Sequence, residues 1–164
     1  MVVMDSSTLI LLAKLGALDK LLESIKEKVI LGERVYREVT AKDTFDAKLI
    51  ADRVKERLME IRKIGKVQLF NDLMKDFGCG AGEAESITLS VERGTGIATD
   101  DKKAMNACKL LKVRWTTTAD VLMEMYNKRK ITQEEALAYA ERLEKYGWYR
   151  RELIEKLKGR IKNE

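Results

Sequence analysis

The chain has 164 residues, with 32 Lys and Arg against 27 Asp and Glu, so its formal net charge is +5, and it contains neither histidine nor proline. The absence of histidine excludes Ser-His-Asp and Cys-His nucleophile pairs, histidine-ligated zinc, and any mechanism in which imidazole is the acid or base at neutral pH. The remaining chemistry depends on carboxylates, lysines, hydroxyls or thiols.

Size and composition are those of one folded domain. Hydrophobic residues make up 45% of the chain and charged residues 36%, and a chain of this length has a radius of gyration of about 15 Å when folded. No apolar run approaches the ~18 residues of a membrane span, and Asp5 stands where a secretory signal carries basic residues. We therefore expect a cytoplasmic protein. Cys79 and Cys108 lack C-x-x-C spacing and are expected to be reduced and buried.

Short apolar runs alternate along the chain with segments of helical periodicity. The runs predict strands over 2–4, 29–31, 67–70, 96–99 and 113–115. Because parallel neighbours need a crossover of about the length of a helix, the alternation predicts a parallel sheet with helices on both faces. Ligands bind such a sheet at the carboxyl ends of its strands.

The segments between the strands predict helices, the first with N-cap candidates at 6–8. The stretch 43–63 has apolar residues at helical spacing and predicts one long amphipathic helix. A glycine-rich turn over 78–82 precedes another helix, which begins near Glu83. Further helices are predicted over 18–25, over 33–40, from Asp100, and from the last strand to Glu164.

Acidic residues follow two of the predicted strands. Asp5 comes directly after the first strand, and Asp100 and Asp101 come directly after the fourth. The carboxyl ends of parallel strands lie at one edge of a sheet, so these side chains are expected to converge there. Each aspartate taken singly also fits an ordinary helix N-cap.

Three glutamates are further candidates. Glu38 lies beside the apolar face of its predicted helix, where a carboxylate is costly unless it is paired or binds a metal. The alternative for Glu38 is an ion pair with Arg34 or Arg37. Glu83 and Glu85 lie in the first turn of their helix, where the helix dipole favours negative charge whatever their function. They flank the apolar face of that helix on its two sides, so helical geometry leaves both as candidates.

A cluster of carboxylates predicts a bound cation, because the charges repel one another and raise one another's pKa. Hard oxygen ligands select Mg²⁺ or Mn²⁺, and such a site activates water for phosphodiester hydrolysis. The glycine-rich turn, G-x-G-x-G-E over 78–83, matches neither the dinucleotide fingerprint nor the P-loop. The excess of positive charge suits a polyanionic substrate.

Four segments carry a resemblance to a known family: V-V-M-D-S-S-T-L-I at 2–10, R-E-V around Glu38, G-A-G-E-A-E-S-I at 80–87 and A-T-D-D at 98–101. With these segments the chain resembles the PIN-domain nucleases, and most closely a prokaryotic branch with a G-x-G-E-x-E turn and a doubled aspartate. The resemblance implies a three-layer α/β/α sandwich with a five-stranded parallel sheet. It implies one domain over 1–164, with a core over about 1–125 and C-terminal helices over about 126–164.

The resemblance also implies the residues of the site. The catalytic and metal-ligating positions fall on Asp5, Glu38, Glu83 and Asp101. Glu85 stays open as the alternative to Glu83, because this chain lacks the family's commoner aspartate at the third position. Asp100 is implied as an accessory metal ligand, and Thr99 or Ser6 as the group that orients a carboxylate or a water.

These residues predict a Mg²⁺- or Mn²⁺-dependent endoribonuclease that hydrolyses single-stranded RNA. The implied partners are a protein antitoxin and a second copy of the chain, and we expect a protein partner to bind along 43–63. The alternative is a catalytically silent PIN-fold module that binds RNA or protein. The aromatic residues Tyr146, Trp148 and Tyr149 are expected to anchor the last helix rather than to stack on bases.

Overall fold

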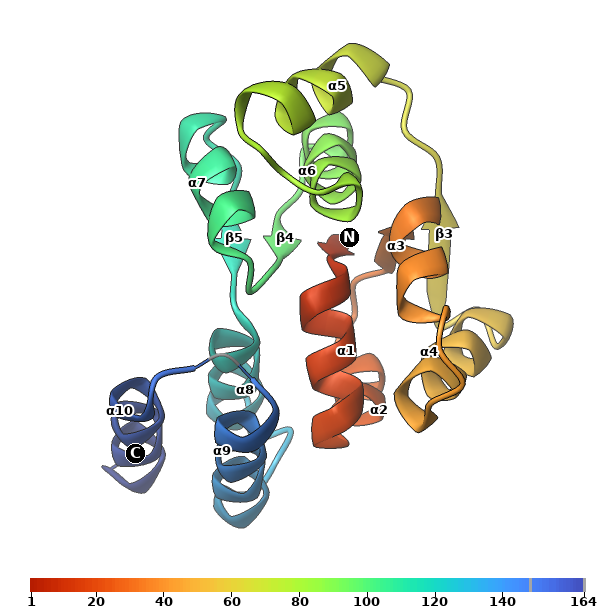
Figure 1. Ribbon diagram of the computed structural model, residues 1–164. Coiled ribbons are helices and arrows are strands. Elements are labelled where there is room, and N and C mark those ends of the chain that lie inside the picture. The colour runs from red at the N-terminus through yellow and green to blue at the C-terminus, as the bar shows by residue number, and fades with distance from the viewer. Residues whose placement is uncertain (148, 164) are drawn as a thin grey trace.

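The fold is built on a sheet of five parallel strands (Figure 1). The computed structural model describes residues 1–147 and 149–163, so Trp148 lies outside the described residues. Within them the strand order is β3-β2-β1-β4-β5. The strands are β1 (Val2–Met4), β2 (Val29–Gly32), β3 (Met59–Arg62), β4 (Ile97–Ala98) and β5 (Trp115–Thr116).

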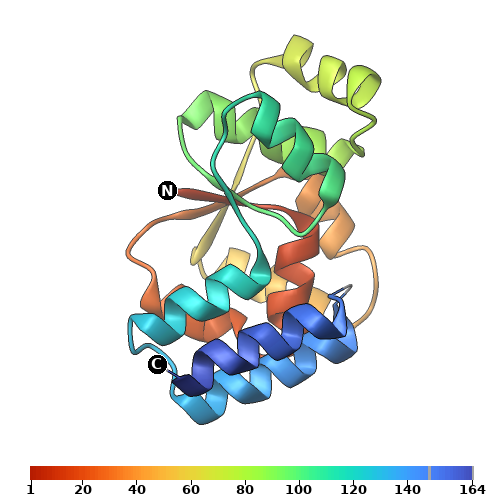
Figure 2. The ribbon, with the colours of Figure 1, turned by 90° about the vertical axis from the view of Figure 1, so that its left-hand side faces the viewer.

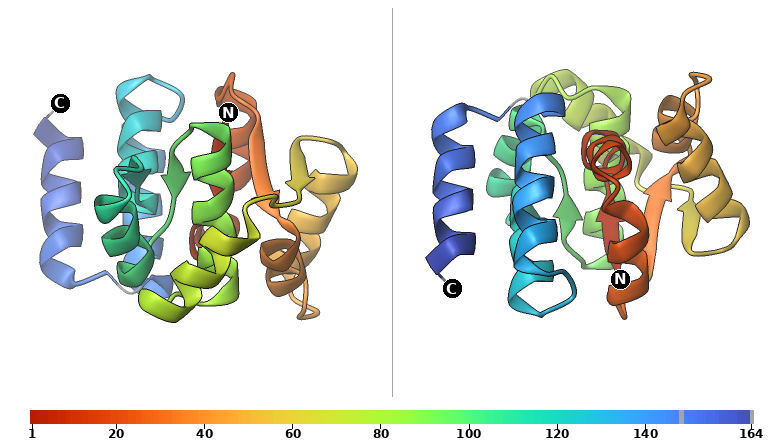
Figure 3. Two further views of the ribbon diagram at one scale, coloured as in Figure 1. Left: turned by 90° about the horizontal axis from the view of Figure 1, so that it is seen from above. Right: turned by 90° about the horizontal axis from the view of Figure 1, so that it is seen from below.

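Helices cover both faces of the sheet and confirm the three-layer α/β/α sandwich (Figures 1 and 3). One face carries α5 (Val67–Asp76), α6 (Ala81–Arg93) and α7 (Lys102–Leu110). The other carries α1 (Ser6–Leu15), α2 (Leu18–Ser24), α4 (Phe45–Lys55), α8 (Thr118–Asn127) and α9 (Gln133–Tyr146), with α10 (Arg151–Asn163) packed on α8 and α9. The remaining helix, α3 (Glu33–Val39), contacts both α1 and α6. In the described part of the chain, no helix has the length and apolar character needed to cross a membrane.

The three central strands, β1, β2 and β4, each contribute to two hydrophobic cores. Val3 and Ile30 pack with α5, α6 and α7, whereas Met4 and Leu31 pack with the helices on the opposite face. Successive strand residues point to opposite faces, and here both faces are covered. The sequences of these central strands are therefore continuous apolar runs, without alternation of apolar and polar residues.

The two cysteines are free and buried, as predicted, in the core beneath α6 and α7. Burial raises the pKa of Cys79 to about 11 and that of Cys108 to about 12. Both thiols therefore stay protonated and unreactive at neutral pH.

The prediction of a single helix over 43–63 is wrong. This stretch contains α4, which ends at Lys55, and the strand β3. Arg57 ends the helix because it takes the left-handed conformation, with φ at 60°. Beyond it, the residues from Met59 to Arg62 alternate between apolar and charged, which is the pattern of a strand with one covered face.

The strand predicted over 67–70 is also wrong, because these residues begin α5. Phe70 and Leu73 are buried together and are three residues apart, which is helical spacing. A short apolar run does not distinguish a strand from a buried helix segment. The third strand along the chain is instead β3, which lies at one edge of the sheet.

The last two helices form an antiparallel pair beside α1 and α8 (Figure 2). Arg142 Nη1 donates to the carbonyl of Leu15 (2.6 Å) at the end of α1. Of the aromatic residues expected to anchor the last helix, Tyr149 is half-buried and donates from its hydroxyl to Asp100. Tyr146 is 43% exposed and does not act as an anchor.

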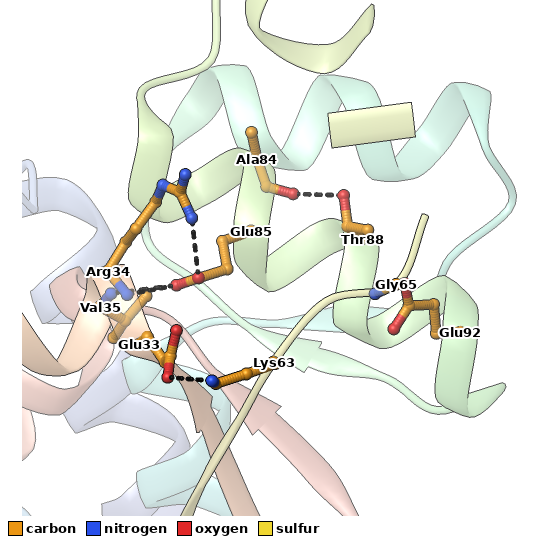
Figure 4. Close-up of polar contacts among 9 residues, drawn as sticks. All are labelled: Glu33, Arg34, Val35, Lys63, Gly65, Ala84, Glu85, Thr88 and Glu92. Carbon is orange, nitrogen blue, oxygen red and sulfur yellow. Dashed lines mark hydrogen bonds and ion pairs between the residues drawn. The ribbon is translucent and has the colours of Figure 1, made fainter. Parts of the chain in front are cut away.

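A buried glutamate joins α6 to α3 (Figure 4). Glu85 is 1% exposed, and its Oε2 accepts hydrogen bonds from the backbone N–H groups of Arg34 (2.7 Å) and Val35 (3.2 Å). These bonds satisfy free donors in the first turn of α3 and place negative charge at the positive end of its dipole. Gly32 leaves room for the carboxylate, since a Cβ there would lie 2.0 Å from Oε2.

We expect Gly32→Ala to lower the free energy of unfolding by about 2–4 kcal/mol, because the added methyl displaces the buried carboxylate from α3. Urea unfolding followed by circular dichroism measures the change. Gly159→Ala is the matched control, because nothing lies within 4 Å of a Cβ there. In the middle of α10 it should raise stability by about 0.5 kcal/mol. Equal effects of the two substitutions would contradict this role of Gly32.

Candidate active site

The candidate site lies where the strand order reverses. The chain passes from β1 to β2 and β3 on one side of the sheet and then returns to β4 on the other side of β1. Such reversals form ligand-binding crevices at the carboxyl ends of parallel strands. Met4 pairs with Ala98, so the residues that follow them, Asp5 and Thr99, leave the sheet side by side.

Asp5 is fully buried at this point and caps α1. Its Oδ1 accepts a hydrogen bond from the Ser6 N–H (2.9 Å), so Asp5 is the N-cap in place of the candidates predicted at 6–8. Thr99 Oγ1 donates to Oδ2 (2.9 Å), and Ser86 Oγ donates to Oδ1 (3.3 Å). Backbone and hydroxyl donors thus fix the orientation of this carboxylate.

The carboxylates around Asp5 perturb one another's ionisation. Burial, together with the charges of Glu83 and Glu38, raises the pKa of Asp5 to about 7, although the hydrogen bond from Thr99 opposes the shift. The pKa of Glu83 is also raised, first by burial and then by the charges of Asp101 and Glu38. Side chains from four separate segments therefore lie close enough to repel one another.

Three of these side chains line a cavity of about 570 Å³: Glu38, Glu83 and Asp101. Asp101 is the N-cap of α7 and accepts a hydrogen bond from the Ala104 N–H (2.8 Å) through one of its two oxygens. The cavity places acidic oxygens from α3, from α6 and from the end of β4 around one space.

Glu38 points out of the core, although its position beside an apolar stripe suggested an inward side chain. It is exposed, and its Oε2 lies against the first turn of α6, where a Cβ on Gly82 would be 2.7 Å away. The ion pair with Arg34 considered for it is not formed, because Arg34 contacts Glu85 instead. The glycine allows α3 and α6 to bring their glutamates together.

Asp100 lines the same cavity, but its oxygens already accept several hydrogen bonds. Thr8 Oγ1 (2.9 Å), the Thr118 N–H (3.0 Å) and the hydroxyls of Thr118 and Tyr149 all donate to it. The side chain therefore joins α1, α8 and the segment before α10. A metal ion at Asp100 would have to displace these donors, whereas Asp101 accepts far fewer.

The two glutamates that helical geometry left open face different neighbours. Glu83 lines the cavity with Glu38 and Asp101, whereas Glu85 is buried against α3. They are two residues apart and so point about 200° apart around the helix axis. Of the two, Glu83 is therefore the one that lines the cavity with the other candidate carboxylates.

Cations also line this cavity, and the sequence pattern did not identify all of them. Lys14 and Arg150 come from α1 and from the segment before α10, and Lys102 follows Asp101. Ser86 was likewise missed as a partner of Asp5. No local signal marks Lys14 and Arg150, because each reaches the site from a segment that only the fold brings near.

The donor set fits the divalent cation that the family resemblance implies. Within the described residues, none of the four carboxylates Asp5, Glu38, Glu83 and Asp101 forms an ion pair with Lys or Arg. Among the same residues, no three acidic or cysteine side chains stand close enough to hold an ion together. Binding of one ion by all four carboxylates therefore requires side-chain movement; Glu38 is exposed and Glu83 is half-buried. Carboxylates that repel one another, offer hard oxygen donors and have no Lys or Arg partner are typical of a Mg²⁺ or Mn²⁺ site.

We expect Glu85→Gln and Glu83→Gln to have opposite effects on the metal-free protein. Glu85→Gln should lower the free energy of unfolding by about 1–3 kcal/mol, because it weakens charge-assisted bonds at the N-terminus of α3. Glu83→Gln should leave stability unchanged or raise it, because it removes one of several repelling charges. Urea unfolding in the presence of a chelator measures both, and a cost for Glu83→Gln as large as that for Glu85→Gln would refute the distinction.

The raised pKa of Asp5 predicts how stability depends on pH. The carboxyl ionises near pH 4 in the unfolded chain but only near pH 7 in the folded one, so rising pH favours unfolding across this range. We expect the metal-free protein to lose up to about 4 kcal/mol between pH 4 and pH 8 from this group. Asp5→Asn should flatten the slope measured by urea unfolding in a chelator. Parallel slopes for the two proteins would contradict the assignment.

Comparison with known proteins identifies a family for this chain. A family model described as a PIN domain matches residues 1–163, nearly the whole chain. Neither the comparison with curated proteins nor that with solved structures found a match. PIN domains are generally nucleases, and the acidic carboxyl edge of the sheet described above suits that chemistry. From the extent of the match and the five-stranded parallel sandwich, the chain belongs to the PIN-domain family.

Proposed function

We propose that the protein is a metal-dependent endoribonuclease that hydrolyses the phosphodiester bonds of single-stranded RNA. The observation that carries the proposal is the group of four carboxylates without cationic partners, at the carboxyl edge of the sheet in the described residues. Carboxylates that repel one another lower the stability of the fold. A bound cation offsets this repulsion and also contacts the substrate.

In this proposal Asp5, Glu38, Glu83 and Asp101 hold Mg²⁺ or Mn²⁺. When bound, the ion supplies Lewis acidity and lowers the pKa of a water, which replaces the imidazole that this chain lacks. Thr99 and Ser86 keep the Asp5 carboxylate in one orientation through their hydroxyl donors. Asp100 supports the site from outside the ligand set, because its hydrogen bonds hold α1 and α8 in place.

The residues around the acidic group favour a nucleic-acid substrate. Lys14, Lys102 and Arg150 line the same cavity, and within the described residues none of them forms an ion pair. Their charges can hold the phosphates of a strand bound at the acidic group, which alone would repel a polyanion. A protein antitoxin and a second copy of the chain are the partners that we propose, to be tested by copurification and by sedimentation.

Cleavage of labelled single-stranded RNA tests the proposal. With Mn²⁺ or Mg²⁺ the wild type should cleave, and Asp5→Asn and Asp101→Asn should each be at least about 100-fold slower, because each removes a charged ligand from the transition state. Asp43→Asn is the matched control, since Asp43 is an exposed aspartate that pairs with Lys48.

The outcomes separate the two functions that the sequence suggested. Equal cleavage by the wild type and the two site variants would overturn the assignment of the site. Binding of RNA without cleavage under any divalent cation would favour the silent RNA-binding module over the nuclease.

A further inference from the structure

The cavity beside the acidic residues has a second wall with different chemistry. It is formed largely by Tyr146, Leu153, Ile10 and Met105, which are apolar or aromatic. We infer that this wall is a nucleobase subsite, which binds the base of a nucleotide adjacent to the scissile phosphodiester. The inference rests on the proposed function, because it takes the acidic residues as the place of cleavage.

The exposed aromatic ring is the main argument for a base. Tyr146 is 43% exposed and Leu153 is 52% exposed, although both line a cavity next to buried core. Apolar side chains that stay in contact with water at the wall of a cavity gain free energy when a planar apolar group covers them. Every nucleobase presents such a face, and stacking on an aromatic side chain needs no particular sequence.

The charges on the same wall identify the ligand as a nucleotide rather than an apolar peptide. Arg150 and Lys14 line the cavity with Tyr146, and in the described chain neither forms an ion pair with a carboxylate. The ammonium of Lys145 lies 5.2 Å from the centre of the Tyr146 ring. A base on the ring and a phosphate at these cations is the combination that single-stranded RNA offers.

A specific contact holds this wall next to the acidic residues. The hydroxyl of Tyr149 donates to Asp100, the neighbour of Asp101, and accepts a hydrogen bond from the Ala119 N–H (3.2 Å). Tyr149 therefore fixes the segment that carries Arg150 at the end of β4. The apolar wall and the carboxylates therefore line one cavity, as a subsite for an adjacent nucleotide requires.

Binding of a fluorescently labelled single-stranded RNA oligomer to the full-length protein in a chelator tests the subsite without cleavage. Tyr146→Ala should weaken binding about tenfold, as expected for the loss of one stacked base. Tyr146→Phe should bind like the wild type, because it keeps the ring. Tyr146→Leu, which keeps the apolar bulk, should bind as weakly as Tyr146→Ala. Phe45→Ala is the control, because Phe45 is 76% exposed on α4 and does not line this cavity.

An oligomer of the same length in which every nucleotide is abasic provides the second arm. It should bind equally well to the wild type and to Tyr146→Ala, whereas Arg150→Ala should weaken both oligomers. Equal binding of the base-containing RNA by all the Tyr146 variants would overturn the subsite, and cleavage by the wild type would then still support the nuclease. Dependence on the Tyr146 ring without cleavage would support the subsite and overturn hydrolysis. A wild type that neither binds nor cleaves RNA would overturn both.

Discussion

Repulsion among carboxylates at the carboxyl edge of the sheet is the constraint on which the rest of the structure depends. Asp5, Glu38, Glu83 and Asp101 come from four segments, and the burial of Asp5 and the partial burial of Glu83 strengthen the repulsion because less water screens it. Hydroxyl and backbone donors offset part of this cost at Asp5 and Asp101. The two apolar cores on either side of the sheet supply the stability that keeps the carboxylates together.

Acidic residues that are close in sequence have opposite tasks. Glu83 faces the cavity, while Glu85 satisfies the first turn of α3. Asp101 keeps most of its acceptor capacity free, while Asp100 accepts bonds from hydroxyls and a backbone N–H and so joins the C-terminal helices to the site. Glu85 and Asp100 thus stabilise the packing of the helices that position Glu83 and Asp101.

Two glycines make room for both the structural glutamate and a glutamate of the candidate site. Gly32 and Gly82 both lie against glutamate carboxylates, Glu85 and Glu38 respectively, at distances that a Cβ would block. They allow α3 and α6 to approach closely enough for one glutamate to stabilise the fold and for another to reach the cavity. The G-x-G-E-x-E turn therefore serves helix packing, in keeping with its mismatch to the phosphate-binding glycine motifs.

The amino-acid sequence predicted the alternation of strands with helices, the parallel sheet and the meeting of Asp5 with the Asp100–Asp101 pair, because buried parallel strands are local apolar runs and their ends share one edge. Local pattern failed at 43–63 and 67–70, where short apolar runs fit both helix and strand and the sheet edge decided between them. The tertiary structure alone separated Glu83 from Glu85, gave Asp100 its hydrogen bonds and brought Tyr146 and Arg150 to the cavity. These features depend on which distant segment packs against a given side chain, and the spacing of residues along the chain does not predict that contact.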